Sequence, residues 1–483
     1  MIQRVHQCFL DLRHEHGKIT VHLPLIAEEL VRSHPHEDEA RPIKFQGPPF
    51  PRRGQEDGAR RLFREAVKVE GTPERDVGRV SQTSGNEQRV GEHPIYRALC
   101  LILSGRYDRV PWPTFAPTDW ERLGQRASLE GVAPLLLRSL TAAGWPAGSQ
   151  ILRPSLSKAR YTTLATNLLI YRELERILAA LNDIPVVLLK GTALAATLYP
   201  DVGRRPLGDL DLLVPHDGLA EAVARLRTMG YHEPYPEIAP GLDRLLGHAV
   251  ALHGGEDVHL CVELHWTLVG GEHHHHPPSM SWFWSQTEPL TPSPALPQCW
   301  GRAGVGVRVT LTPTAHLLHL AAHLMLQHGG AQARLLWFYD LDLLIRRQAG
   351  RVDWEELLRR AREFHWAAAL HAALQGARDR LGTPLPPGLL DALAGADDPR
   401  TLRLVRRKAH PLQTRATQTW NTISSLEWRA GLRLALAIAF PSPAYVRWRY
   451  RMGRLWPLCY PYRWLDIVCE ILSTTRTLIH RGQ

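Results

Sequence analysis

The sequence predicts an α+β fold, in which a small mixed sheet is flanked by helices and a helical C-terminal region follows. Apolar residues recur every three or four positions between residues 94 and 183, as they do in amphipathic helices. Over residues 184–268 the pattern changes to short β-rich runs, and the helical period returns after residue 311. With 483 residues and 44% hydrophobic content, the chain can bury a large core.

The first 90 residues mix charges with segments rich in proline and glycine and show no sustained periodicity, which predicts a disordered extension. Helices are then expected over residues 95–105, 119–144 and 164–183, the second with Asp119 as its cap. These helices open the main predicted domain, residues 94–385.

The sheet is expected inside this domain, at about residues 184–268. Short β-rich runs at 184–190, 207–214 and 258–269 alternate with helical segments at 192–199 and 217–230. The resulting order β-α-β-α-β indicates a mixed sheet. Residues 270–286, which include the four histidines 273–276, are expected to form a loop. Helices are expected again over 312–329, 333–350 and 352–382.

The six cysteines form no CxxC pair, so neither a disulfide framework nor a zinc knuckle is indicated, and a reducing cytoplasm fits best. No apolar run reaches the roughly 18–20 residues that a membrane span needs, and the first residues lack the apolar core of a signal peptide. The sequence therefore predicts a cytoplasmic protein without a transmembrane segment.

Residues 400–483 are expected to form a basic, aromatic, helical tail. From Arg400 onward there are fifteen Lys and Arg residues against three acidic ones, accompanied by five tryptophans. Solvated helix faces, core packing, nucleic acid and an anionic membrane surface can each account for this composition. The anionic surface is the favoured partner, and it would place the protein at the periphery of a membrane.

Two aspartates, Asp209 and Asp211, stand one residue apart inside an apolar run. Side chains at i and i+2 of a strand point to the same face, so the two carboxylates project together. Two solvated acids at a strand end would explain a bare pair. Carboxylate oxygens are also the preferred ligands of Mg²⁺, which commonly shares them with nucleotide phosphates, and Mn²⁺ would serve in its place.

Neighbouring residues strengthen the metal hypothesis. Gly191 and Thr192, between a strand and a helix, supply close backbone approach, N–H groups and a hydroxyl, which together can cradle phosphates. Lys190 and Arg205 add positive charge. Glu263, on the third expected strand, could activate an attacking hydroxyl or hold a second ion.

The segments "VVLLKGTALAATLYPDVGRRPLGDLDLLV" and "VELHW" resemble the bacterial family described as uncharacterised nucleotidyltransferases, within the superfamily that includes DNA polymerase β. The similarity runs from about Pro94 to Gly382 and implies a nucleotidyltransferase-type sheet. It also implies Mg²⁺-dependent transfer of a nucleoside monophosphate from an NTP to a hydroxyl-type acceptor.

In that superfamily, paired aspartates bind the metal-nucleotide, a third carboxylate assists the acceptor, and a Gly-Ser/Thr turn holds the phosphates. The resemblance assigns these roles to Asp209 with Asp211, to Glu263, and to Gly191 with Thr192. The chain departs from the pattern in two places, with Lys-Gly-Thr at the turn and Glu where Asp is more usual. Alternative functions are a toxin-like enzyme that modifies RNA ends or proteins, and a noncatalytic nucleotide-binding or membrane-surface module.

Four histidines near these motifs could contact the acceptor. His265 shares a strand face with Glu263, and His323 shares a helix face with His316 and His319. His265 and His323 are the candidates for the acceptor pocket, whereas structural histidines are the default for the helix. A zinc site would need a fourth ligand, which the sequence does not identify.

Asp340 and Asp342 repeat the spacing of the first aspartate pair but occur in a helical context. Residues i and i+2 of a helix diverge by about 200°, which argues against a metal site. Asp340 could instead reach the sheet from a packed helix, or cap a charge there.

Overall fold

The computed structural model describes residues 94–256, 258–271, 276–290, 309–330, 333–396, 399–409, 415–451 and 453–481. Contacts divide the chain into two units, Met1–Val90 and Gly91–Gln483. The predicted disordered extension falls in the first unit and lies outside the described residues, as do His273, His274 and His275 of the histidine run.

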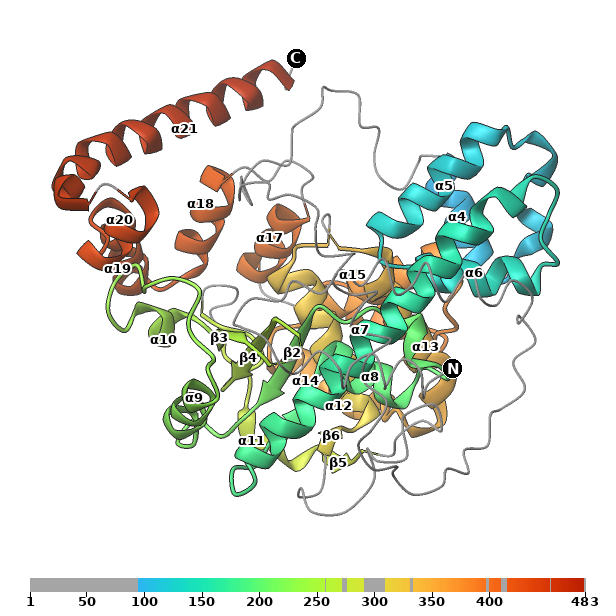
Figure 1. The fold of residues 1–483 in the computed structure, drawn as a ribbon, viewed down its shortest axis with the longest axis horizontal. Helices are drawn as coiled ribbons and strands as arrows, with labels where there is room; N and C mark the ends of the chain where they lie inside the picture. Colours follow the sequence, from blue (N-terminus) through green and yellow to red (C-terminus); the bar gives the residue numbers. More distant parts are fainter. Residues whose placement is uncertain are drawn as a thin grey trace, which may run out of the picture. The chain divides into compact units, whose positions relative to one another are not determined.

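Helices are confirmed in the three segments expected before the sheet (Figure 1): α4 (Pro94–Leu103), α5 (Pro117–Leu129), α6 (Ala133–Ala142) and the long α7 (Arg153–Ala180). The segment expected over residues 119–144 is divided into α5 and α6, and α7 begins before the expected residue 164. The expected cap needs correction, because α5 begins two residues before Asp119. Asp119 is the third residue of the helix, and its carboxylate accepts a hydrogen bond from the backbone N–H of Ala116. The acid still satisfies a free donor at the helix start.

The sheet has six strands rather than the three expected: β1 (Val187–Leu188), β2 (Asp209–Leu213), β3 (Ala249–Gly254), β4 (Leu260–His265), β5 (Thr287–Pro289) and β6 (Val309–Leu311). Their order is β3-β4-β2-β1-β6-β5. The pairs β2–β4 and β1–β6 are parallel, and the other three are antiparallel. The prediction of a mixed sheet is therefore confirmed.

The sheet extends beyond the expected limit at residue 268, because β5 and β6 add an edge formed by residues 287–289 and 309–311. These strands have three residues each, which is too short for an alternating pattern to be recognised. Strand β1 is also shorter than expected, since Pro185 cannot donate to a ladder and Lys190 already belongs to α8 (Lys190–Thr197).

Two helical layers cover the sheet. On one face, Leu210 and Leu212 of β2 pack with Val262 and Leu264 of β4 in the same core cluster as residues of α7 and α9 (Leu219–Thr228). On the other face, Leu213 belongs to a larger cluster. Residues of α12 (Pro313–Ala322), α13 (Leu335–Gln348) and α15 (Ala367–Leu381) form much of that cluster.

The remaining helices are α10 (Leu242–Leu246), α11 (Met280–Ser285), α14 (Trp354–Glu363), α16 (Leu389–Leu393), α17 (Pro399–Lys408), α18 (Arg415–Ser425), α19 (Trp428–Ala439), α20 (Pro443–Tyr450) and α21 (Cys459–Arg481). The expectation of a loop over residues 270–286 is wrong in part, because Met280–Ser285 form helix α11. The helical nature of the C-terminal region is confirmed. Across the described residues, no helix combines the length and apolar character that crossing a membrane requires.

Short 3-10 turns and one π-helix complete the described part of the chain. The turns are Tyr107–Arg109, Trp112–Thr114, Ser149–Leu152, Val202–Arg204 (η5), Ala349–Arg351 and Gly453–Leu458, and the π-helix η7 (His323–Gln327) continues α12. A single π-helical turn inside a helix often marks a functional site.

Candidate active site

Strands β2 and β4 place three carboxylates on one face of the sheet. The parallel register sets Asp211 directly beside Glu263, and Asp209 precedes Asp211 by two residues on the same side. Leu210 and Val262 point to the opposite face, where they are fully buried. The alternation of polar and apolar residues thus separates the site from the core beneath it.

The ammonium of Lys190 lies among these carboxylates. Its Nζ donates a hydrogen bond of 2.7 Å to Oδ1 of Asp211 and lies 3.8 Å from Oε2 of Glu263. The backbone of Lys190 is left-handed, with φ of 43°, a conformation that costs a residue with a Cβ about 1 kcal/mol or more. The turn from β1 into α8 is therefore held in a strained form while the lysine side chain is buried against Asp211.

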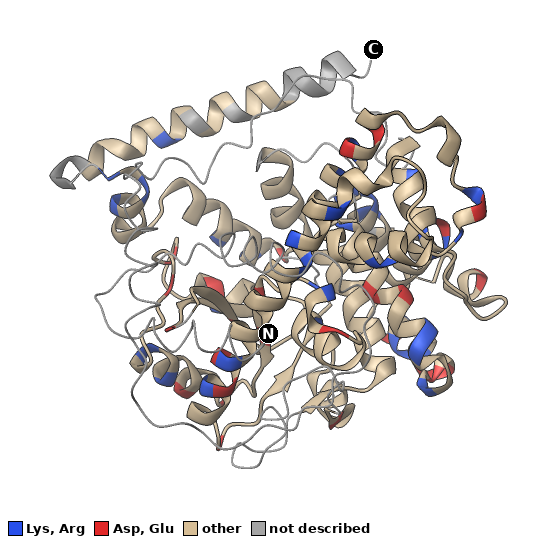
Figure 2. Cartoon of the chain, turned by 45° about the vertical axis from the view of Figure 1, so that its right-hand side comes forward, with Lys and Arg blue, Asp and Glu red and all other residues tan. Residues whose placement is uncertain are grey.

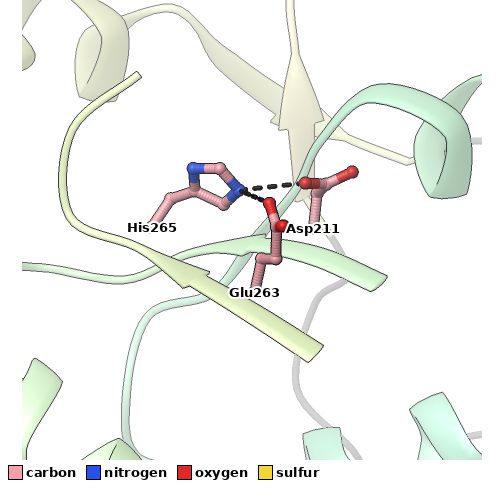
Figure 3. Close-up of side chains that lie close together, drawn as sticks. All are labelled: Asp211, Glu263 and His265. Carbon is pink, nitrogen blue, oxygen red and sulfur yellow. Dashed lines mark hydrogen bonds and ion pairs between the residues drawn. The ribbon is translucent and has the colours of Figure 1, made fainter. Parts of the chain in front are cut away.

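His265, at the end of β4, completes the cluster (Figure 3). Its Nε2 lies 2.9 Å from Oδ1 of Asp211 and 3.3 Å from Oε2 of Glu263, and the side chain is fully buried. Burial and the nearby Lys190 both favour the neutral ring. The hydrogen bonds to the two carboxylates outweigh them and raise the pKa of His265 above its ordinary value. The Nε2–H of His265 thus donates a hydrogen bond to the acidic pair.

The charges of this cluster are strongly coupled. Burial alone would raise the pKa of Asp211, but Lys190 and the hydrogen bond from His265 hold it well below its ordinary value. Burial alone would lower the pKa of Lys190, but Asp211 and Glu263 raise it. The hydrogen bond from His265 lowers the pKa of Glu263, against the effects of burial and Asp211. Asp211 and Glu263 are therefore carboxylates near neutral pH.

Asp209 differs from the other two acids. Asp209 is exposed, and its carboxyl does not belong to the close group of possible ligand atoms from Asp211, Glu263 and His265. Desolvation, together with the negative charges of Asp211 and Glu263, raises the pKa of Asp209 to about 6. The site therefore carries an excess of negative charge at this carboxyl, which an added cation would relieve.

A group of donors suited to a metal ion is present. Among the described residues, one ligand atom each from Asp211, Glu263 and His265 lies within 4.8 Å of the others. Carboxylate oxygens fit Mg²⁺ or Mn²⁺, and Asp209 stands beside them on β2. The donor group thus contains Asp211 of the expected metal pair but not Asp209, and it adds Glu263 and His265 of β4. Lys190 and His265 both donate to Oδ1 of Asp211, so a divalent ion would compete with them for this oxygen.

Arg205 lies beside the expected phosphate-binding turn, but its charge is already paired. Nε and Nη2 donate hydrogen bonds of 2.9 and 2.7 Å to the two oxygens of Asp340, and both side chains are buried. A Cβ at Gly191 would overlap the guanidinium, so this position requires glycine for close approach of Arg205. The charge of Arg205 is thus paired within the protein, and its contact with a nucleotide stays a prediction.

Thr192 follows Gly191 in the first turn of α8. Its side chain is fully buried, and Oγ1 has no hydrogen-bond partner within the described part of the chain. The hydroxyl of Tyr171 on α7 donates to its carbonyl oxygen at 3.0 Å. The expected phosphate-binding hydroxyl is therefore present, and it lies beneath the surface rather than on it.

Asn167 of α7 is a positioning residue that the sequence did not reveal. Its amide nitrogen donates to the carbonyl oxygens of Val202 and Arg205 at 2.6 and 2.7 Å, and its oxygen accepts from the N–H of Leu207 at 3.2 Å. The side chain is fully buried. It fixes the chain between η5 and β2, directly before the two aspartates. The sequence offered no signal for it beyond an asparagine inside a helix.

The histidines of α12 and η7 occupy different environments. His316 and His319 are buried, and Nε2 of His316 and both ring nitrogens of His319 are without a partner among the described residues. Burial lowers the pKa of His316 to about 4 and that of His319 well below its ordinary value. His323 is half-buried, and its Nδ1 is hydrogen-bonded to Oε1 of Gln327. Neutral rings therefore line this helix.

The second aspartate pair diverges as expected for a helix. Asp340 accepts hydrogen bonds from Arg205 and, at 2.8 Å, from the hydroxyl of Tyr199. Asp342 accepts from Arg346 and Thr383 at 2.8 Å each. The expectation that Asp340 caps a charge beside the sheet is confirmed, and these two carboxylates have separate structural partners.

Residues 116–382, more than half of the chain, match the profile of a family described as uncharacterised nucleotidyltransferase. The chain belongs to this uncharacterised nucleotidyltransferase family. The match begins after the Pro94 expected from the sequence, and it contains Lys190, both aspartates and Glu263. Membership supports general nucleotidyl transfer with an NTP as substrate. No curated protein and no solved structure matches the chain significantly.

Proposed function

We propose that this protein transfers a nucleoside monophosphate from an NTP to a hydroxyl-type acceptor, with Mg²⁺ or Mn²⁺ as cofactor and pyrophosphate as the second product. The observation that carries the proposal is the strand register that sets Asp211 beside Glu263, with Asp209 on the same face. The raised pKa of Asp209 supports a cation at this place, because the carboxyls repel one another. Family membership supports the reaction class.

Asp209 and Asp211 would hold the metal ion together with the nucleotide, and Glu263 would serve the acceptor. A bound divalent ion supplies stabilisation of the phosphate charge. Glu263, kept ionised by the hydrogen bond from His265, takes the proton of the acceptor hydroxyl. The acceptor oxygen then forms a bond to the α-phosphorus, and the bond from that phosphorus to pyrophosphate breaks.

The turn at the start of α8 would bind the triphosphate. Lys190 contributes an ammonium that already contacts Asp211, and Gly191 and Thr192 contribute backbone N–H groups and a hydroxyl. Arg205 acts through Asp340 as a positioning residue behind Gly191. His265 holds the two carboxylates in place.

The acceptor pocket would lie between β4 and η7. His265 and His323 are its proposed histidines, and His319 joins them because its neutral ring is fully buried with both nitrogens unpartnered in the described structure. Neutral imidazoles can accept or donate hydrogen bonds to a hydroxyl-bearing acceptor. The presence of three such histidines favours a polar acceptor.

Label transfer tests the function. The purified protein is incubated with each α-labelled NTP, Mg²⁺ and a cell extract, and the product that acquires label is isolated. Asp211→Asn should abolish transfer, whereas the matched variant of an exposed acid, Asp217→Asn, should leave it unchanged. Label on an RNA end or on a protein would identify those acceptors. Absence of labelled product from all four NTPs, with Mg²⁺ and with Mn²⁺, would favour a noncatalytic nucleotide-binding module.

A further inference from the structure

Large apolar side chains are exposed mainly in the C-terminal helices. Of the seventeen exposed large hydrophobic residues in the described parts of the chain, thirteen lie between Trp420 and Leu472. Exposed apolar residues are ordinary when scattered, but a concentrated set marks an interaction surface. The clustering of these residues therefore indicates that the C-terminal helices bind a partner.

These residues form a continuous stripe. Trp428, Leu432, Leu436 and Phe440 follow one another at four-residue intervals along α19 and just past its end, each 51–73% exposed. Residues four apart lie on one helix face. Phe440 contacts the ring of Trp464 in α21, with centroids 5.4 Å apart.

The stripe continues along α21, where Leu465, Val468 and Leu472 stand at three- and four-residue intervals and are 52–66% exposed. Residues of α19 and α21 thus form one surface, which we call the C-terminal apolar surface. It consists of Trp428, Leu432, Leu436, Phe440, Trp464, Leu465, Val468 and Leu472.

Helix α19 cannot bury this stripe by turning, because its opposite side is already packed. Ala437 forms a small core with Leu242 and Leu246 of α10. Directly after α19, the N–H of Ser442 donates a hydrogen bond of 2.7 Å to the carbonyl of Ile238. The apolar stripe is therefore presented outward by a helix that is anchored through its other face.

Exposed arginines accompany the apolar surface in the C-terminal helices. Residues 415–481 contain ten arginines and three acidic residues. Arg429 and Arg433 directly follow Trp428 and Leu432 and are exposed, as are Arg447, Arg449 and Arg451 of α20 and its end. In Figure 2 the C-terminal helices carry blue bands on a mostly tan ribbon. Positive charge beside an exposed apolar stripe is the pattern of helices that lie in an anionic bilayer interface.

We propose that the C-terminal apolar surface docks onto a lipid bilayer with anionic headgroups. Aliphatic side chains enter the acyl boundary, and the flanking arginines reach the phosphate groups. Nucleic acid is a poorer fit, because five of the eight residues of the surface are Leu or Val, which offer no ring for base stacking. A symmetric contact with a second copy would bring two strongly positive surfaces together.

Vesicle co-sedimentation of the full chain tests the proposal. The protein should pellet with phosphatidylcholine vesicles that contain phosphatidylglycerol, and much less with phosphatidylcholine alone or at high salt. Replacing Leu432, Leu436, Leu465 and Leu472 together by Ser should lower the binding at least tenfold. The matched control, Leu129→Ser with Ile151→Ser, changes exposed apolar residues outside the surface and should bind like the wild type.

The arginine contribution is tested by Arg429→Gln, Arg433→Gln and Arg449→Gln, which should reduce binding to anionic vesicles about tenfold without unfolding the chain. Several results would overturn the proposal. These are equal binding to neutral and anionic vesicles, no binding to either, or binding retained by the four-serine variant. Salt-sensitive binding to RNA or DNA without vesicle binding would replace lipid by nucleic acid. Concentration-dependent dimers abolished by the four serines, without vesicle binding, would replace it by a second copy.

Discussion

Asp209 should destabilise the fold while it serves the reaction. In the folded protein its pKa rises from the ordinary 3.8 to about 6, because the carboxyl is partly desolvated beside Asp211 and Glu263. A shift of about two units corresponds to about 3 kcal/mol at neutral pH. The residue is exposed, so solvent screening reduces this to about 1 kcal/mol. Asp209→Asn should therefore be more stable than the wild type when no metal is bound.

The raised pKa of Asp209 also sets how the stability of the fold changes with pH. The folded state binds the proton of Asp209 more tightly than the unfolded state, so stability falls as pH rises from about 4 to about 6 and then levels off. The advantage of Asp209→Asn should be complete near pH 7.5 and reduced by about half at pH 5. In EDTA, the variant should melt about 1–3 °C above the wild type at pH 7.5.

Thermal unfolding followed by circular dichroism measures this difference, with Asp217→Asn as the matched control in which an exposed acid outside the site is changed. Mg²⁺ should stabilise the wild type more than the Asn variant, and the variant should transfer no nucleotide. The reasoning would be refuted if Asp209→Asn melted at or below the wild-type temperature in EDTA at pH 7.5. The reasoning would also be refuted if the difference in melting temperature between Asp209→Asn and the wild type were as large at pH 5 as at pH 7.5.

Three further predictions follow from single contacts. Glu263→Gln should lower the rate of transfer at least a hundredfold and leave the nucleotide affinity measured by calorimetry little changed. Thr192→Ala should weaken nucleotide binding itself. An equal loss of affinity in both variants would rule out the acceptor role of Glu263. Asp340→Asn should lower the free energy of unfolding by about 3–5 kcal/mol in urea titrations, because Arg205 keeps a buried charge without its partner; a loss under 1 kcal/mol would show that the pair is dispensable. Asn167→Ala should cost about 1–3 kcal/mol, measured in the same way, since buried backbone groups lose their partner, and unchanged stability would contradict the anchoring role.

Much of the architecture was readable from local sequence patterns. The helical periods predicted the segments that form α4 to α7 and α12 to α15, because one face of each helix must be apolar to pack. They did not predict the breaks between α5 and α6 and between α14 and α15. The alternation in residues 207–214 predicted a strand that separates Asp209 and Asp211 from Leu210. Strands of two or three residues, such as β1, β5 and β6, carry too little pattern to be bounded in this way.

The sequence by itself determined that two aspartates share one strand face and that Glu263 lies on a later strand, since alternation along a strand is a local property. Only the tertiary structure decided which groups meet there. The register of β2 and β4 brought Glu263 and His265 to Asp211, and the ammonium of Lys190 reached the same carboxylate. The pairing of Arg205 with Asp340 spans 135 residues. Such contacts depend on how separate elements pack, and no spacing within one element encodes them.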